Sequence, residues 1–176
     1  MDVSDLITVF DLCFRDSFQT ELLGGAEEPL YQPRSDTRHM HQIWFRQDYI
    51  ASALHEAAHW CVAGQQRRQL TDYGYWYAPD GRSNEQQKAF EHAEVKPQAM
   101  EWIFSFCAAV PFRVSADNLV SGAEPTELFK QRIVEQARCY VTQGLPTRAR
   151  IFCQALAHHN NRTVPAAEVF CINDIA

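Results

Sequence analysis

The segment DYIASALHEAAHWCVAG, from Asp48 to Gly64, contains no Lys or Arg and predicts a helix that is buried on almost every side. At about 100° per residue, apolar side chains cover most of the helix circumference. The remaining polar side chains form one narrow stripe, which consists of Ser52, His55, Glu56 and His59. Asp48 is a favourable N-cap and Gly64 a favourable C-terminal stop. Such a helix has to lie at the centre of the fold, because its apolar surface needs neighbours on several sides.

The polar stripe contains the motif HExxH, here His55-Glu56-Ala57-Ala58-His59. Histidines four residues apart lie one turn apart on the same helix face, so their imidazole nitrogens can converge on one divalent metal ion. A buried polar group without a partner costs about 2 to 7 kcal/mol, and a metal ion supplies the missing partner. The alternative is a pair of core histidines that are hydrogen-bonded to carbonyl groups, with Glu56 paired to one of them.

A third metal ligand has to come from elsewhere, because the residues after His59 do not continue the longer motif HExxHxxGxxH. The best candidate region is SNEQQKAFEHAEVKPQAMEWIF, residues 83–104. Ser83 is a favourable N-cap for a helix there, and Pro97 is expected to kink that helix or to start a second one. One side of the helix carries polar side chains, namely Gln87, Glu91, Glu94, Gln98 and Glu101.

Glu94 is the preferred third ligand, and Glu91 is the alternative. Gln98 stands one turn after Glu94, where its amide can hold a ligating carboxylate in place, whereas Val95 stands one turn after Glu91. A polar stripe of this kind is also typical of a solvated helix face, in which case neither glutamate binds metal.

Two histidines and one carboxylate suit two kinds of enzyme chemistry. A zinc ion would keep one open position for a water molecule that Glu56 could deprotonate, as in a minimal metallopeptidase. A ferrous ion would form a facial triad with open positions for dioxygen and substrate, as in hydroxylases. A structural metal with four protein ligands is a third alternative. The ligand types alone leave these alternatives open.

The chain resembles the bacterial elongation factor P hydroxylases in three runs: LHEAAHWCVAGQQRRQLTDYGYWYAPDGR, FEHAEVKPQAMEWIF and PFRVSADNL. The resemblance covers nearly the whole chain and is most specific between Trp44 and Leu119. Members of that family hydroxylate a lysine of elongation factor P that already carries a β-lysyl group. The resemblance therefore implies a monooxygenase-type reaction that uses Fe(II) and O2, with elongation factor P as the protein partner.

The family resemblance also implies a two-histidine, one-carboxylate metal motif on a fold similar to a small bacterial metal-dependent ribonuclease. Carried onto this chain, the histidines are His55 and His59, whereas the carboxylate is not assigned by the resemblance. Glu56 is the candidate catalytic residue: it is the general base in the peptidase reading and a supporting residue in the hydroxylase reading. The sequence shows no signature for binding 2-oxoglutarate, so that co-substrate is not assigned.

An aromatic run between residues 72 and 80 is the candidate substrate-binding segment. Tyrosine rings and carboxylates could line a pocket for a long side chain that ends in an ammonium group. The candidate residues are Tyr73, Tyr75, Tyr77 and Asp80, with Trp76 and Asp72 beside them. The alternative is an alternating strand that buries two of the rings. His39 and His41 precede the metal helix, but loop histidines are more often unbound, and we do not assign them as ligands.

Composition favours one compact hydroxylase domain over residues 1–176. The 176 residues are 46% hydrophobic and 12% aromatic, enough for a core without disulfides or structural metals. A net charge of −6 argues against direct nucleic-acid binding and is compatible with a cationic substrate. The six cysteines show no CxxC pairing, the N-terminal segment lacks a basic signal region, and no apolar run reaches membrane-spanning length. These features predict a cytoplasmic enzyme that does not bind membranes.

The pattern of apolar and turn-forming residues predicts an α+β fold that is dominated by helices and has a small β-sheet. A helix is expected over residues 4–22, ending at the two glycines 24 and 25, followed by a loop to residue 40. Strands are expected over residues 42–46 and 70–77 and a short extended piece after Pro111. Two further helices are expected, one from Pro125 to Gly144 and one from Thr147 to about His158.

Overall fold

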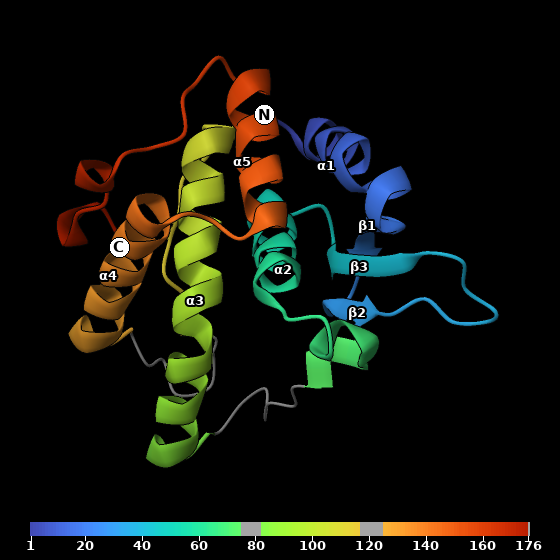
Figure 1. Ribbon diagram of the computed structural model, residues 1–176. Helices are drawn as coiled ribbons and strands as arrows, with labels where there is room; N and C mark the ends of the chain where they lie inside the picture. Colours follow the sequence, from blue (N-terminus) through green and yellow to red (C-terminus); the bar gives the residue numbers. More distant parts are fainter. Residues whose placement is uncertain (75–81, 117–124, 176) are drawn as a thin grey trace.

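The computed structural model describes residues 1–74, 82–116 and 125–175, and within these ranges helices predominate over one three-stranded sheet (Figure 1). The α+β class expected from the sequence is confirmed. The helices are α1 (Val3–Phe18), α2 (Ile50–Val62), α3 (Asn84–Ala108), α4 (Glu127–Gln143) and α5 (Thr147–His159), and the strands are β1 (Thr20–Ala26), β2 (Leu30–Gln32) and β3 (His41–Arg46). Short 3-10 turns complete the chain: η1 (Arg67–Gln69), η2 (Thr71–Gly74), η3 (Ala167–Val169) and η4 (Ile172–Asp174).

The sheet has the order β1-β3-β2, with β1 parallel and β2 antiparallel to the central strand β3. The prediction of one helix over residues 4–22 is wrong at its C-terminal end, because α1 ends at Phe18 and Gln19 takes a left-handed conformation with φ 50°. The chain then pairs with β3, which buries Thr20 and Leu22 on the inner face of the sheet. Pairing with a distant strand overrides the helical spacing that continues through Leu22.

The segment after α2 also differs from expectation. Residues 70–74 do not form the predicted strand, because Asp72 and Tyr73 take left-handed conformations with φ 46° and φ 58°. The Asp72 carboxylate accepts the backbone N–H of Tyr31 at 2.8 Å, which fixes η2 against β2. The predicted loop before residue 40 contains β2, whose single buried side chain, Tyr31, enters the core.

Helix α2 forms as predicted over the HExxH motif and lies at the centre of the molecule. Its N-cap is Tyr49, without a side-chain hydrogen bond, so the expected cap at Asp48 is wrong. At the other end, Arg148 of α5 donates to the carbonyl of Cys61 at 3.2 Å and to that of Ala63 at 2.7 Å. The same guanidinium lies 4.4 Å from the ring centroid of Trp60. A buried cation therefore satisfies carbonyl groups that the end of a helix leaves without partners.

Helix α3 is one continuous helix of 25 residues that passes through Pro97, so Pro97 does not start a second helix. Its beginning matches the prediction: the Ser83 hydroxyl accepts the backbone N–H of Gln86, and the Gln86 side chain accepts the backbone N–H of Ser83. This capping box fixes where the helix starts and therefore which residues face α2. The predicted helices near residues 125–144 and 147–158 are confirmed as α4 and α5.

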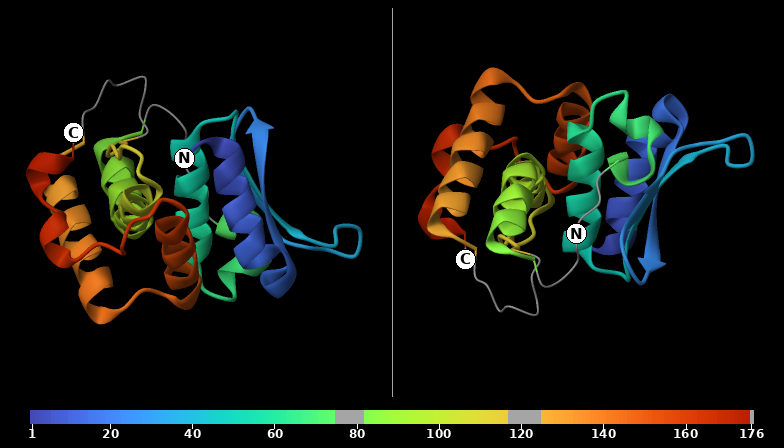
Figure 2. Two further views of the ribbon diagram at one scale, coloured as in Figure 1. Left: turned by 90° about the horizontal axis from the view of Figure 1, so that it is seen from above. Right: turned by 90° about the horizontal axis from the view of Figure 1, so that it is seen from below.

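The elements pack in a row with α2 near the middle. Views from above and below show the sheet and α1 on one side of α2, and α3 and α4 on the other (Figure 2). Between α1, α2 and α5 the core is built from aromatic rings: Phe10, Phe14 and Phe18 pack against Trp60, and Phe152 packs against Phe10 and Phe14. The position and orientation of α2 are thus set by packing on several sides.

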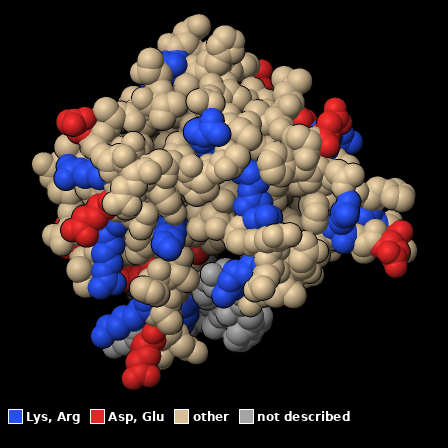
Figure 3. Space-filling model, viewed as in Figure 1, with Lys and Arg blue, Asp and Glu red and all other residues tan. Residues whose placement is uncertain are grey.

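Charged side chains are distributed unevenly over the surface. On the face seen in Figure 3, Lys and Arg occupy the middle and lower parts, whereas Asp and Glu lie mostly near the edges. The net charge of −6 is therefore not concentrated on that face. Across the described part of the chain, no helix combines the length and apolar character that a membrane span requires.

Candidate metal centre

His55 and His59 project from the same side of α2, one turn apart, as the HExxH spacing predicts. Their ring centroids are 4.6 Å apart and their Nε2 atoms 3.0 Å apart. Both side chains are partly buried at the boundary between α2 and α3, with 27% and 15% of their surface exposed. The two Nε2 atoms therefore point toward a common position, which is the arrangement that a single metal ion requires.

Glu94 of α3 completes this cluster. One carboxylate oxygen, Oε1, lies 3.2 Å from Nε2 of His59, and the other, Oε2, lies 3.5 Å from Nε2 of His55. The candidate ligand atoms of the three residues all lie within 4.8 Å of one another. The other sequence candidate, Glu91, accepts a hydrogen bond from the Thr126 hydroxyl at 3.3 Å and is not part of the cluster. Of the two glutamates, the structure brings Glu94 to the histidines.

Charge interactions favour the ionised forms of Glu94 and His55. Burial would raise the pKa of Glu94, but His59 and His55 together with the Gln98 amide lower it to about 2. Burial would likewise lower the pKa of His55, but the hydrogen bond to Glu101 and the neighbouring carboxylates raise it to about 10. Without metal, a proton on the imidazole thus balances the buried carboxylates, and a divalent ion bound here would displace that proton.

Glu101 is a part of the site to which the sequence analysis gave no role. Its Oε2 atom accepts a hydrogen bond from Nδ1 of His55 at 2.8 Å, and the residue is only 7% exposed. A proton on Nδ1 leaves the Nε2 lone pair free toward Glu94 and His59, as a metal ligand requires. The signal was present in the sequence, because Glu101 stands two turns after Glu94 on the same helix stripe. Its pairing with His55 depends on how α2 and α3 cross, which the sequence does not reveal.

Gln98 takes the supporting place that its spacing predicted. Its Nε2 atom lies 3.5 Å from Oε2 of Glu94 and donates to the carbonyl of Ser115 at 2.8 Å. The backbone N–H of Ser115 donates in return to Oε1 of Gln98 at 3.1 Å. The predicted short extended piece after Pro111 has no regular secondary structure over its described residues. Its residue Ser115 nevertheless fixes the side-chain amide of Gln98, because the backbone of Ser115 bonds both the nitrogen and the oxygen of that amide.

Glu56 lies at the edge of the cluster. Burial raises its pKa, and His55 and His59 partly oppose that rise. Among the described residues, Glu56 has no hydrogen-bond or ion-pair partner. Its carboxyl group is therefore available to a ligand in the cavity.

A cavity of about 580 Å³ opens onto the cluster and is lined by His55, His59 and Glu94 together with Glu28, Glu56, Asp72 and Tyr73. The Tyr73 ring lies nearly parallel to the His59 ring, 11° between planes and 6.2 Å between centroids. The other substrate-binding candidates, Tyr75, Tyr77 and Asp80, lie outside the described residues.

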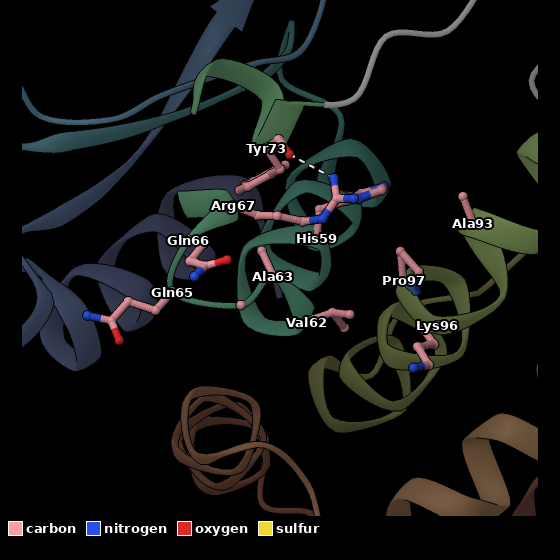
Figure 4. Close-up of a pocket in the computed structure, with 11 residues that line it drawn as sticks. His59, Val62, Ala63, Gln65, Gln66, Arg67, Tyr73, Ala93, Lys96 and Pro97 are labelled. Atoms are coloured by element: carbon pink, nitrogen blue, oxygen red, sulfur yellow. Dashed lines mark hydrogen bonds between the residues drawn. The ribbon is translucent and has the colours of Figure 1, made fainter. Parts of the chain in front are cut away.

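A second cavity, of about 610 Å³, is also lined by His59 and Tyr73 (Figure 4). Arg67 crosses it and donates to the carbonyl of Tyr73 at 3.0 Å, and Lys96 of α3 lies on its opposite wall. His59 and Tyr73 thus line both cavities.

Comparison with known proteins identifies the family. The model of the family described as "Elongation factor P hydroxylase" matches residues 9–170. The chain belongs to the elongation factor P hydroxylase family. It is also 47% identical over 154 residues to the elongation factor P lysine hydroxylase of Haemophilus influenzae, and the match covers 88% of this chain and 86% of that relative. The resemblance inferred from the sequence is confirmed.

The match to the elongation factor P hydroxylases includes all residues of the candidate metal centre, from His55 to Ser115. The family assignment therefore favours the oxidative reading of the HExxH motif over the peptidase reading. Two imidazole nitrogens and one carboxylate oxygen are a donor set that suits a divalent transition-metal ion and leaves coordination positions open.

Proposed function

We propose that this chain hydroxylates the β-lysyl-extended lysine of elongation factor P in the cytoplasm, at an Fe(II) centre held by His55, His59 and Glu94. The observation that carries the proposal is the convergence of two imidazoles and one buried carboxylate within 4.8 Å in a chain of this family. The relative from Haemophilus influenzae is named for lysine hydroxylation of elongation factor P.

The donor set fits a ferrous ion. Glu94 is 2% exposed, and its lowered pKa of about 2 keeps it anionic, so it offers the negative oxygen donor that a facial triad needs. Glu101 holds the His55 ring so that Nε2 is presented to the metal, and Gln98 restrains the Glu94 carboxylate. When bound, the iron supplies O2 activation. The protein residues hold it at one end of a cavity and keep the substrate carbon beside it.

The cavity lining suits an extended side chain that carries ammonium groups. Glu28, Glu56 and Asp72 provide carboxylates outside the metal cluster, and the Tyr73 ring provides an aromatic wall, while Arg46, Arg82 and Arg113 line other parts of the cavity. A cation that leaves water needs such partners, because burial of an unpaired ammonium group is unfavourable. We include Tyr75, Tyr77 and Asp80 in the substrate-binding set on the basis of the sequence. Glu56 is proposed to contact the substrate or to support the metal centre, and not to act as a general base.

The test is mass spectrometry of β-lysylated elongation factor P after incubation with the iron-loaded protein, a reductant and O2. We expect one added oxygen atom on the modified lysine, and none with unmodified elongation factor P. His55→Ala and His59→Ala should abolish the reaction and lower the metal content, because each change removes one of only three protein ligands. Full activity and metal content in both variants, or cleavage of a peptide bond by the wild type, would contradict the proposal.

A further inference from the structure

Four rings from four different elements form a column that leads away from the candidate metal centre. The Tyr73 ring of η2 lies 6.2 Å from that of His59, at 11° between planes. The Tyr31 ring of β2 stacks on Tyr73 at 4.3 Å and 13°, and the His41 ring of β3 lies 6.2 Å from Tyr31 at 7°. His41 is only partly buried. The column therefore runs from a candidate metal ligand through two buried phenols, 4% and 1% exposed, toward the surface.

The two phenols in this column differ in their hydrogen bonds. The Tyr73 hydroxyl is buried and has no hydrogen-bond partner among the residues that the structure describes. The Tyr31 hydroxyl donates to the carbonyl of Arg68 at 2.8 Å, and its oxygen also lies 3.0 Å from Nδ1 of His41. A buried hydroxyl without a partner has no group to receive its proton, whereas that of Tyr31 has an imidazole nitrogen within hydrogen-bonding distance.

His41 is arranged as a proton acceptor. The backbone N–H of Arg34 donates to its Nδ1 at 3.1 Å, so this nitrogen carries a lone pair and the ring proton is on Nε2. Burial and the nearby guanidinium groups of Arg34 and Arg68 lower the pKa of His41, which keeps the ring neutral at physiological pH. Burial raises the pKa of Tyr31 to about 12, so this phenol retains its proton until it is oxidised.

Oxidation of a phenol releases both an electron and a proton. An oxidant strong enough to attack an aliphatic C–H bond is also strong enough to oxidise a phenol, whose O–H bond is weaker. When oxygen is activated without substrate in the cavity, the nearest oxidisable groups are therefore at risk, and a protein has to control such side reactions. Tyr73 is the nearer ring, but no described residue is placed to receive its proton. Tyr31 has such a residue, because its hydroxyl hydrogen can turn from the Arg68 carbonyl to Nδ1 of His41, 3.0 Å away.

We propose that Tyr31 and His41 form a redox site that supplies electrons to the metal centre when oxygen is activated without substrate. In each step Tyr31 loses one electron, which passes through the Tyr73 and His59 rings to the centre, and its phenolic proton moves to Nδ1 of His41. A small-molecule thiol or enediol at the partly exposed His41 then supplies one electron to the oxidised Tyr31 and releases one proton to solvent, and His41 returns its proton to the Tyr31 oxygen. Two such steps oxidise two thiols to a disulfide, or one enediol to a diketone, and with two protons from solvent they reduce one activated oxygen atom to water. The inference rests on the proposed oxidative function.

In the test, iron-loaded protein is exposed to O2 and ascorbate in the absence of elongation factor P, and samples are frozen at successive times. Electron paramagnetic resonance spectra of the frozen samples are then recorded. We expect a neutral tyrosyl radical in the wild type, and loss of that signal in Tyr31→Phe. Tyr140→Phe, which alters a tyrosine of α4 outside the column, is the matched control and should retain the signal. His41→Gln keeps the Tyr31 phenol but removes the proton acceptor, so it should also abolish the signal, and it remains informative if Tyr31→Phe fails to fold.

Two parallel measurements separate this inference from the proposed function. Hydroxylation of elongation factor P is assayed on the same preparation. If the wild type hydroxylates its substrate but the radical is absent, or persists in both Tyr31→Phe and His41→Gln, the redox site is refuted and the function stands. Photochemical one-electron oxidation of the metal-free protein tests the Tyr31–His41 pair without iron. A radical that is lost in both variants supports the pair even if hydroxylation fails, and a radical that persists in them refutes it.

Discussion

Glu101 offers the sharpest test of how the candidate metal centre is built. Its carboxylate accepts the His55 Nδ1–H at 2.8 Å inside the protein, and loss of such a partner typically lowers metal affinity 10- to 100-fold, about 1.4 to 2.7 kcal/mol. Glu101→Gln keeps an acceptor oxygen but removes the charge, and Glu101→Leu removes both. We therefore expect weaker binding in both variants, with the larger loss in Glu101→Leu, because a buried Nδ1–H is then left without an acceptor.

Proton competition makes the expected loss depend on pH. Burial lowers and Glu101 raises the pKa of His55, to about 10 overall, so in the wild type a proton competes with metal below that pH. Glu101→Gln lowers this pKa and weakens the competition, which partly offsets the lost affinity at neutral pH but not at alkaline pH. Anaerobic calorimetric titration with Fe(II), at neutral and at alkaline pH, measures the difference in affinity between wild type and variant. Glu91→Gln, on the same helix but outside the cluster, is the control and should bind like wild type. Equal affinity of both Glu101 variants and the wild type would refute this reasoning.

Four further predictions follow from the same geometry. Glu94→Ala should lose most of its bound metal, whereas Glu91→Ala should keep it, as measured by metal analysis after dialysis; the reverse result would exchange their roles. Metal binding to the wild type should release about one proton, so affinity should rise about tenfold per pH unit up to about pH 10, where a flat profile would contradict a protonated His55. Glu56→Gln should keep about a tenth or more of wild-type hydroxylation; a loss as complete as in His55→Ala would favour a general base. Tyr73→Phe should leave the thermal melting temperature unchanged or raise it, because it removes a buried hydroxyl that has no partner in the described part of the chain; a clear drop would show that the hydroxyl is bonded in solution.

The sequence predicted best those features that depend on local spacing. The HExxH helix and the choice of Glu94 over Glu91 both follow from counting turns along one helix, and the structure places these residues accordingly. Where a segment pairs with another segment that is distant in the sequence, the prediction from local spacing was wrong. The segment after Phe18 carries a helical pattern but becomes β1 because β3 lies beside it. The left-handed residues Asp72 and Tyr73 form a 3-10 turn instead of a strand.

The column from His59 to His41 could not be inferred from the sequence at all. Its rings come from four elements, and their order depends on how η2 folds over β2. The role of Glu101 is an intermediate case. Its position on the helix stripe is visible in the sequence, but its contact with His55 exists only because α2 and α3 cross at that point.

The contact between Arg148 and the end of α2 bears on the order in which the site is assembled during synthesis. Arg148 follows Cys61 by 87 residues, so the carbonyl groups at the end of the metal helix gain this partner only after α5 has left the ribosome. Glu94 and Glu101 are also made well after His55 and His59. A nascent chain that exposes only the HExxH helix therefore lacks both the third ligand and the cation that holds the helix end. Metal loading would then follow completion of the chain, and a protein truncated before α5 should bind metal weakly even though it contains every candidate ligand.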